Sequence, residues 1–199
     1  MEVTDLSPKA AEIAICAQSL LAERGYNGFS YADISEAVHI SKASIHFHFP
    51  SKAELVQTVL RRYREQGRQA LAALEKQVAD PLARLYAYTG YWQGCIRDGS
   101  APFCICAMLG SELTAIPAPV ADEVRGHFQD LATWLASVLE QGAANGTFRL
   151  RTDPSVEALA LMATVHGGML AARVYGDPEA FASVVQQGVA QLLASVPQD

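Results

Sequence analysis

The chain has 199 residues, a formal net charge of −6 and a hydrophobic fraction of 50%. This is long and apolar enough for one small domain plus a larger one, and no run of about 18 apolar residues predicts a membrane span. The first residues lack the basic and then apolar layout of a signal peptide, so we expect a cytoplasmic protein whose four cysteines are thiols.

The first informative segment, residues 29–55, predicts two short helices that are separated by a tight turn. Ser30 is a good N-cap, and Asp33 stands three residues later, as in a capping box. Ile34, Ala37 and Val38 have the spacing of one buried helical face. The turn at residues 39–41 ends this helix, and Ser41 caps the next.

The second short helix, residues 42–48, has the composition of a helix that enters a DNA groove. We expect Ala43, Ile45 and Phe49 to face the core. This leaves five side chains for DNA, at the N-terminal end and outer face of a recognition helix: Lys42, Ser44, His46, Phe47 and His48. Pro50 ends the helix and Ser51 caps a third, where Lys52 is expected to contact a phosphate.

Residues 10–60 resemble the DNA-binding domain of the TetR family of bacterial repressors. The likeness rests on Arg24-Gly25-Tyr26, on Gly28-Phe29-Ser30, and on a set of matching positions: Ile34, Ala37, Ile40, Ser41, Lys42, His48, Phe49, Ser51, Lys52 and Leu55. His39 and Ala43 replace two glycines of the family pattern, and His46 replaces a common tyrosine that contacts phosphate.

The resemblance implies a helix-turn-helix domain over residues 1–53 and a helical effector-binding and dimerisation domain over residues 54–199. It also implies a pseudo-palindromic double-stranded operator. The residues expected at the DNA are Ser30, Tyr31, Ser41, Lys42, Ala43, Ser44, His46, Phe47, His48 and Lys52.

The negative net charge is compatible with DNA binding because positive charge is concentrated in one segment. Residues 38–64 contain five Lys or Arg against one acid, Glu54, together with three histidines. The segment therefore predicts a local basic surface on an otherwise acidic protein.

The remaining chain predicts only helices, about nine in all. Apolar periodicity and Asp-Pro starts place them at residues 54–78, 81–97, 103–113, 120–145, 154–175 and 178–195. The last two carry more apolar surface than a small bundle needs, and the family's final helices form a four-helix bundle between subunits. We therefore expect a homodimer, with Gly167 and Gly168 leaving room for close packing.

The larger domain should bind a small-molecule effector of unknown identity, in a pocket with apolar walls and a few polar groups. The candidate residues are Trp92, Phe103, Met108, Glu112, His127, Trp134, Met162, His166 and Met169. An alternative is a thiol-based sensor of oxidants or electrophiles that uses Cys104, with Cys106 as the neighbouring thiol. Two residues that are two apart on one helix face different directions, which argues against a Cys104–Cys106 disulfide.

Other classes of protein lack support in the sequence. No metal-ligand spacing, glycine-rich phosphate loop or nucleophile elbow occurs, so we expect no metal, no cofactor and no enzyme activity. A helical adaptor that binds protein instead of DNA remains an alternative. The interpretation is a repressor that leaves a palindromic operator when its effector binds.

Overall fold

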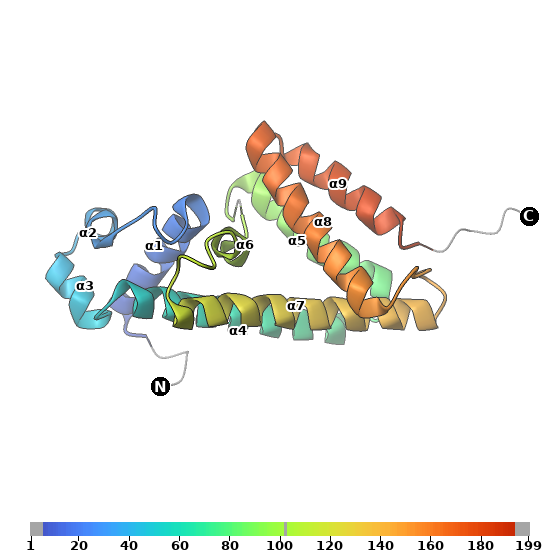
Figure 1. Ribbon diagram of the computed structural model, residues 1–199, viewed down its shortest axis with the longest axis horizontal. Helices are drawn as coiled ribbons and strands as arrows, with labels where there is room; N and C mark the ends of the chain where they lie inside the picture. Colours follow the sequence, from blue (N-terminus) through green and yellow to red (C-terminus); the bar gives the residue numbers. More distant parts are fainter. Residues whose placement is uncertain (1–5, 102, 194–199) are drawn as a thin grey trace, which may run out of the picture. The chain divides into compact units, whose positions relative to one another are not determined.

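The computed structural model describes residues 6–101 and 103–193, which form nine α-helices and no β-strand (Figure 1). The helices are α1 (Pro8–Arg24), α2 (Tyr31–Val38), α3 (Lys42–His48), α4 (Lys52–Gln77), α5 (Pro81–Asp98), α6 (Ile105–Gly110), α7 (Ala118–Ala144), α8 (Pro154–Tyr175) and α9 (Pro178–Ala190). The all-α prediction with an N-terminal helix-turn-helix is confirmed. One isolated β-bridge joins Phe148 to Leu193.

Local sequence signals set most of the helix ends. Asp80, Asp153 and Asp177 accept hydrogen bonds from the first turns of α5, α8 and α9, each of which has proline at its start. α6 is shorter than expected because residues 111–115 form turns, and α7 begins before Pro119, which lies in its first turn. The range expected for the last helix extends beyond residue 193 and so beyond the described residues.

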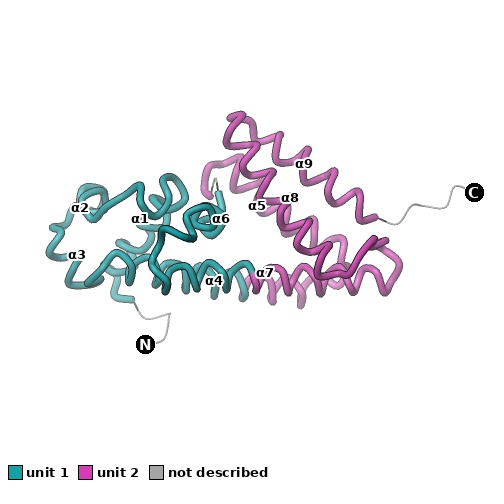
Figure 2. Tube along the Cα trace, in the orientation of Figure 1, with its two compact units in different colours: residues 1–68, 103–128 teal, residues 69–102, 129–199 magenta. Residues whose placement is uncertain are grey.

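The chain divides into two compact units, each built from two stretches of sequence (Figure 2). The first unit contains residues 1–68 and 103–128, and the second contains residues 69–102 and 129–199. Fully buried aliphatic side chains form the core of the first unit, among them Ile13, Leu21, Ile34, Ile45, Leu55, Leu60 and Leu109. Leu85, Leu135, Leu139, Met169 and Phe181 do so in the second.

In the second unit, α8 packs along α9 through one face only. Gly168 allows this approach, since a Cβ there would lie 3.2 Å from the Phe181 ring and 3.3 Å from Val185. Gly168 therefore makes room for α9 of its own chain, and not for a partner subunit. Gly167 is different, because no atom lies within 4 Å of the position of its Cβ.

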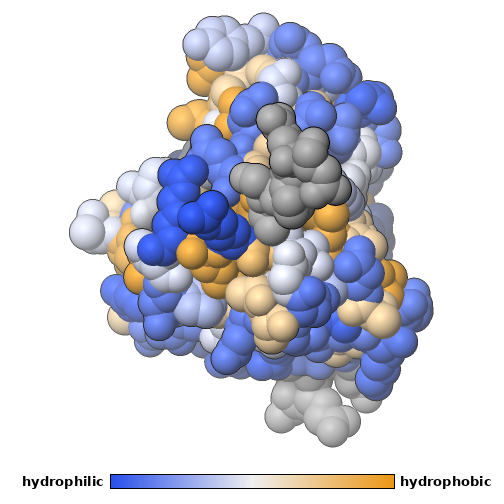
Figure 3. Space-filling model, turned by 90° about the vertical axis from the view of Figure 1, so that its right-hand side faces the viewer, coloured by the Kyte–Doolittle hydropathy of each residue, from blue (hydrophilic) through white to orange (hydrophobic). Residues whose placement is uncertain are grey.

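The opposite face of α8 is an apolar stripe that we call the α8 stripe: Val156, Leu159, Ala160, Ala163, Gly167, Leu170 and Val174. Leu170 is 54% exposed and Val174 is 70% exposed. By length and hydropathy alone, α8 could cross a membrane, and 39% of its most apolar stretch is buried inside the protein. This is weak evidence for a membrane span, because core helices of water-soluble proteins have the same length and hydropathy. Figure 3, which colours one face of the molecule by hydropathy, shows apolar residues at the surface among polar ones.

Candidate nucleic-acid interface

Side-chain hydrogen bonds cap the N-terminal ends of both α2 and α3. Ser30 Oγ accepts from the Ala32 amide, while Asp33 accepts from the Ser30 amide at 2.8 Å, so the capping box is present. These bonds with Ser30 lower the pKa of Asp33. Ser41 Oγ accepts from the Ser44 amide at the start of α3. Ser30 and Ser41 thus fix the two helices that present the interface.

His39 connects these helices in the left-handed region, with φ of 53°. It is the only described residue other than glycine with a positive φ. This conformation explains physically why the family pattern has glycine here, because a side chain is disfavoured in it.

The outer face of α3 is exposed in the way a recognition helix requires. Lys42, Ala43, His46 and Phe47 are exposed, and Phe47 reaches 84% exposure although it is a large apolar side chain. Ser44 and His48 are half-buried, while Ile45 and Phe49 are buried as expected. The expectation that Ala43 and Ala37 face the core was wrong, since both are exposed.

The rings of Tyr31 and His46 pack together, Tyr31 from the interior and His46 from the exposed face of α3. Tyr31 is buried, and its hydroxyl donates to the Phe49 carbonyl at 2.9 Å. Burial raises the pKa of Tyr31 to about 12. The Tyr31 ring meets the His46 ring edge-on at 4.8 Å, and His46 Nδ1 lies 3.2 Å from the Pro50 carbonyl. Tyr31 therefore supports the turn from inside instead of presenting its hydroxyl to a phosphate.

The His46 contact also restricts what this ring can offer to DNA. A carbonyl only accepts, so Nδ1 must carry the proton that it shares with Pro50. In a neutral ring Nε2 is then an acceptor, which suits a base edge or water and not a phosphate oxygen.

Lys52 points into the protein, which corrects the expectation of a phosphate contact. Its ammonium donates to the Phe29 carbonyl and lies over the rings of Phe29, at 4.1 Å from the centroid, and Tyr26, at 4.7 Å. Burial lowers the pKa of Lys52, although Glu112 and Asp33 act in the opposite direction. Lys52 therefore fastens the start of α4 to the loop between α1 and α2.

Glu112, expected to contact an effector, binds the same loop instead. Its Oε1 accepts from the Tyr26 amide at 3.1 Å, and Oε2 accepts from the backbone and side-chain amides of Asn27. Gly25 lies directly below, where a Cβ would be 1.8 Å from Oε1. We call Glu112, Tyr26 and Asn27 the loop clasp. No local pattern in the sequence indicates this clasp, because Glu112 lies 86 positions from Tyr26 and 85 from Asn27.

The other effector candidates fall into two groups, one in each unit. The first unit holds Phe103, Met108 and His127, and the second holds Trp92, Trp134, Met162, His166 and Met169. In the second unit, Trp134 is 8% exposed and lies beside the Tyr88 ring, with centroids 5.6 Å apart. The buried indole N–H of Trp134 has no hydrogen-bond partner in the structure. Such a donor normally has one.

Cys104 and Cys106 are buried, which does not favour the redox alternative. Cys104 is the residue before α6 and is not inside the helix, so the argument from helical spacing does not apply. Its sulfur lies 3.5 Å from the Tyr63 hydroxyl and 3.8 Å from His127 Nε2. Burial and a hydrogen bond with Cys104 raise the pKa of Cys106, which disfavours the reactive thiolate form. No group of three potential metal ligands occurs among the described residues.

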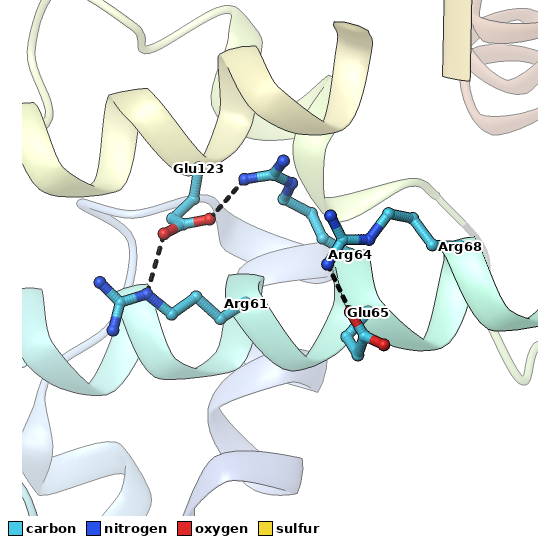
Figure 4. Close-up of a pocket in the computed structure, with 5 residues that line it drawn as sticks. All are labelled: Arg61, Arg64, Glu65, Arg68 and Glu123. Carbon is cyan, nitrogen blue, oxygen red and sulfur yellow. Dashed lines mark hydrogen bonds and ion pairs between the residues drawn. The ribbon is translucent and has the colours of Figure 1, made fainter. Parts of the chain in front are cut away.

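The basic segment is also partly engaged inside the protein. Arg61 and Arg64 of α4 both pair with Glu123 of α7, and Arg68 pairs with Glu65 (Figure 4). Lys42 remains exposed on α3. The positive charge available to DNA is thus smaller than the count over residues 38–64 predicts. The spacing of the three arginines, at positions 61, 64 and 68, is the signal in the sequence that indicates this cluster.

Comparison with protein families gives two matches that together span most of the chain. The family described as "Bacterial regulatory proteins, tetR family" matches residues 17–59. The family described as "Tetracyclin repressor-like, C-terminal domain" matches residues 81–187.

Individual relatives agree with these matches. A TetR-family regulator of solved structure from Agrobacterium tumefaciens is 47% identical, with a TM-score of 0.91, over 94% of this chain and 98% of that one. The transcriptional regulator AcuR of Cereibacter sphaeroides is 26% identical over 80% of this chain and 74% of AcuR. The HTH-type transcriptional repressor DhaR of a Mycobacterium species is 25% identical over 79% of this chain and 78% of DhaR.

Proposed function

The chain belongs to the TetR family of DNA-binding transcriptional regulators, and from this premise we propose that it is a repressor released from a palindromic operator by a small-molecule effector. We assign DNA binding to residues 1–53 and effector binding with dimerisation to residues 54–199. The name of the relative DhaR describes a repressor, which supports repression as the mode of action.

The observation that carries the proposal is the exposed outer face of α3. A helix-turn-helix inserts the second helix into the major groove with its N-terminal residues at base edges. Lys42 can bind a guanine edge, Ser44 can donate or accept, and exposed Phe47 can contact a thymine methyl group. The Phe47 side chain is 84% exposed, so its ring is accessible for this contact.

A palindromic operator requires two copies of α3, and the α8 stripe supports dimerisation through the two C-terminal helices. Its small residues, Ala160, Ala163 and Gly167, permit close approach of a second helix at its centre. Two recognition helices in a two-fold dimer would contact half-sites about 34 Å apart on one side of the duplex.

The effector site is proposed for the second unit, beside Trp134. A buried N–H without an acceptor costs roughly 1–3 kcal/mol, and an acceptor atom of a bound ligand would recover that free energy. Trp92, Met162 and Met169 are buried apolar side chains of the same unit and suit the walls of such a site. Release then requires that the effector binds one conformer more tightly than the other.

Operator binding is the experiment that tests this proposal. Selection from random duplexes should yield a palindrome, and the affinity should fall steeply as salt rises. Lys42→Ala and Ser44→Ala should change which duplexes are selected, whereas Lys76→Ala, an exposed lysine at the end of α4, should not. Equal losses on every duplex would contradict the role of α3, and no duplex binding at low salt would support the adaptor. We also propose that the protein is cytoplasmic, because its operator in the bacterial cell lies in that compartment.

A further inference from the structure

Three arginines of α4 line a hollow on the surface of the first unit. Arg61, Arg64 and Arg68 stand at the i, i+3 and i+7 positions, which bring them to one face of the helix. With Glu65 of α4 and Glu123 of α7 they enclose a volume of about 250 Å³ (Figure 4). Three guanidinium groups around one hollow are the usual means by which proteins bind oxyanions.

A carboxylate of the protein itself binds two of these arginines. Glu123 Oε1 lies 2.9 Å from Arg61 Nε, and Oε2 lies 2.7 Å from Arg64 Nη1. The Arg64 and Glu123 side chains are only 20% and 13% exposed, whereas Arg61 and Arg68 are about half-exposed. Glu123 thus occupies the position that an external oxyanion would take between the two guanidinium groups.

A glycine of α7, Gly126, leaves space for the guanidinium group of Arg64. Gly126 is buried one turn after Glu123, and a Cβ there would lie 2.3 Å from both Cζ and Nη1 of Arg64. Any other residue at position 126 would force the guanidinium out of its place. The hollow therefore depends on a residue without a side chain as well as on its charged groups.

The charges of the lining residues favour an added anion that takes the place of Glu123. The five lining residues are three arginines and two glutamates, so their formal charges sum to +1. A ligand with two or three negative charges can bind all three guanidinium groups at once, which a single side-chain carboxylate cannot do.

We propose that this hollow binds a small multivalent oxyanion, a polycarboxylate or a phosphate, which displaces Glu123 from Arg61 and Arg64. Displacement would release the start of α7 from α4, the helix that begins at Lys52 behind the recognition helix. The link from anion binding to operator release rests on the proposed function, but binding itself does not.

The test is calorimetric titration of the purified, DNA-free protein with citrate and, separately, with inorganic phosphate, each at an ionic strength matched with sodium chloride. We expect saturable binding of at least one anion. Arg64→Gln should weaken it by about tenfold, as should Arg68→Gln, a more exposed position where folding is less at risk. Arg125→Gln is the matched control, because Arg125 is an exposed arginine of α7 outside the hollow.

Glu123→Gln distinguishes a binding site from a structural ion pair. If Glu123 competes with the ligand, this variant should bind the anion more tightly than the wild-type protein, by several-fold or more. Unchanged or weaker anion binding in Glu123→Gln would overturn the proposal, as would binding that sodium chloride reproduces or that Arg125→Gln reduces equally.

The same samples separate this proposal from the proposed function. Fluorescence anisotropy of a labelled operator measures duplex binding in the absence of the anion. A protein that does not bind the operator in this measurement would contradict the proposed repressor function but not the anion site. If the anion binds but operator affinity is unchanged, the anion site is supported and its role in operator release is contradicted.

Discussion

The Glu112 carboxylate accepts a hydrogen bond from the Tyr26 amide at 3.1 Å, across 86 positions of sequence. The segment after α6 is thereby joined to the loop that enters the helix-turn-helix. Gly25 is required below this carboxylate, because it has a φ of +73° and no space for a Cβ. Within the first unit, a movement of Glu112 would act directly on the support of the recognition helix.

Glu112→Ala should weaken the loop clasp by leaving the amides of Tyr26 and Asn27 without their acceptor. We expect a loss of about 1 kcal/mol in the free energy of unfolding, since these contacts are only partly buried. Hydrogen exchange should accelerate at residues 26–27 but not in α8. Equal protection of residues 26–27 in the variant and the wild-type protein would mean that the clasp contributes nothing.

Lys52→Met should reduce stability without changing the salt dependence of operator binding. The variant keeps an unbranched apolar side chain but loses the bond to the Phe29 carbonyl and the contact of the cation with the two rings, worth about 1 kcal/mol. Denaturant unfolding and anisotropy at several salt concentrations measure the two effects. A fall of about one in the salt slope would show that Lys52 does neutralise a phosphate.

Tyr31→Phe should lower stability at neutral pH by about 1 kcal/mol, because it removes the bond to the Phe49 carbonyl. The folded protein holds the pKa of Tyr31 at about 12, above its ordinary value of 10. The unfolded chain therefore loses this proton first as pH rises, so the stability from Tyr31 is complete below pH 10 and declines toward pH 12. Urea unfolding of both proteins from pH 8 to 11.5 should show the difference shrinking above about pH 10. A constant difference would contradict this account.

His39→Gly should stabilise the protein by about 0.5–1 kcal/mol, because glycine adopts the left-handed conformation without steric cost. Ala37→Gly is the matched control, an exposed position inside α2 where glycine should destabilise by about 1 kcal/mol. Thermal unfolding compares the two. A lower melting temperature for His39→Gly would point to an unrecognised stabilising contact of the imidazole.

Leu170→Asp should prevent dimerisation by placing a charge on the α8 stripe. Light scattering should give the mass of a monomer, and operator affinity should fall by at least about a hundredfold, since one recognition helix contacts only one half-site. Tyr86→Asp changes an equally exposed apolar residue of α5 and should leave the dimer intact. A dimer that survives Leu170→Asp would place the interface elsewhere.

The sequence predicted features that depend on neighbours along the chain. The capping box of Ser30 and Asp33, the cap at Ser41 and the Asp-Pro starts of α5, α8 and α9 all form within one helical turn. Their geometry is local, so three or four residues specify it.

Side-chain direction was harder to predict wherever a distant segment competes for the group. Lys52 turns toward the Phe29 carbonyl, and Glu112 turns toward the Asn27 amide, because the fold brings these polar groups within hydrogen-bond distance. Ala37 and Ala43 have no such partner; alanine is small enough to be exposed or buried at little cost, so apolar spacing alone does not place it.

Covering the α8 stripe in a dimer would make the stability of this protein depend on its concentration. If the stripe is covered only in the dimer, each dilution exposes Leu170, Val174 and their neighbours to water, and the free energy of unfolding falls by mass action. At a few copies per cell, the amount of folded protein and the occupancy of the operator would then fall together. Duplex DNA would oppose this loss, because it holds two subunits side by side.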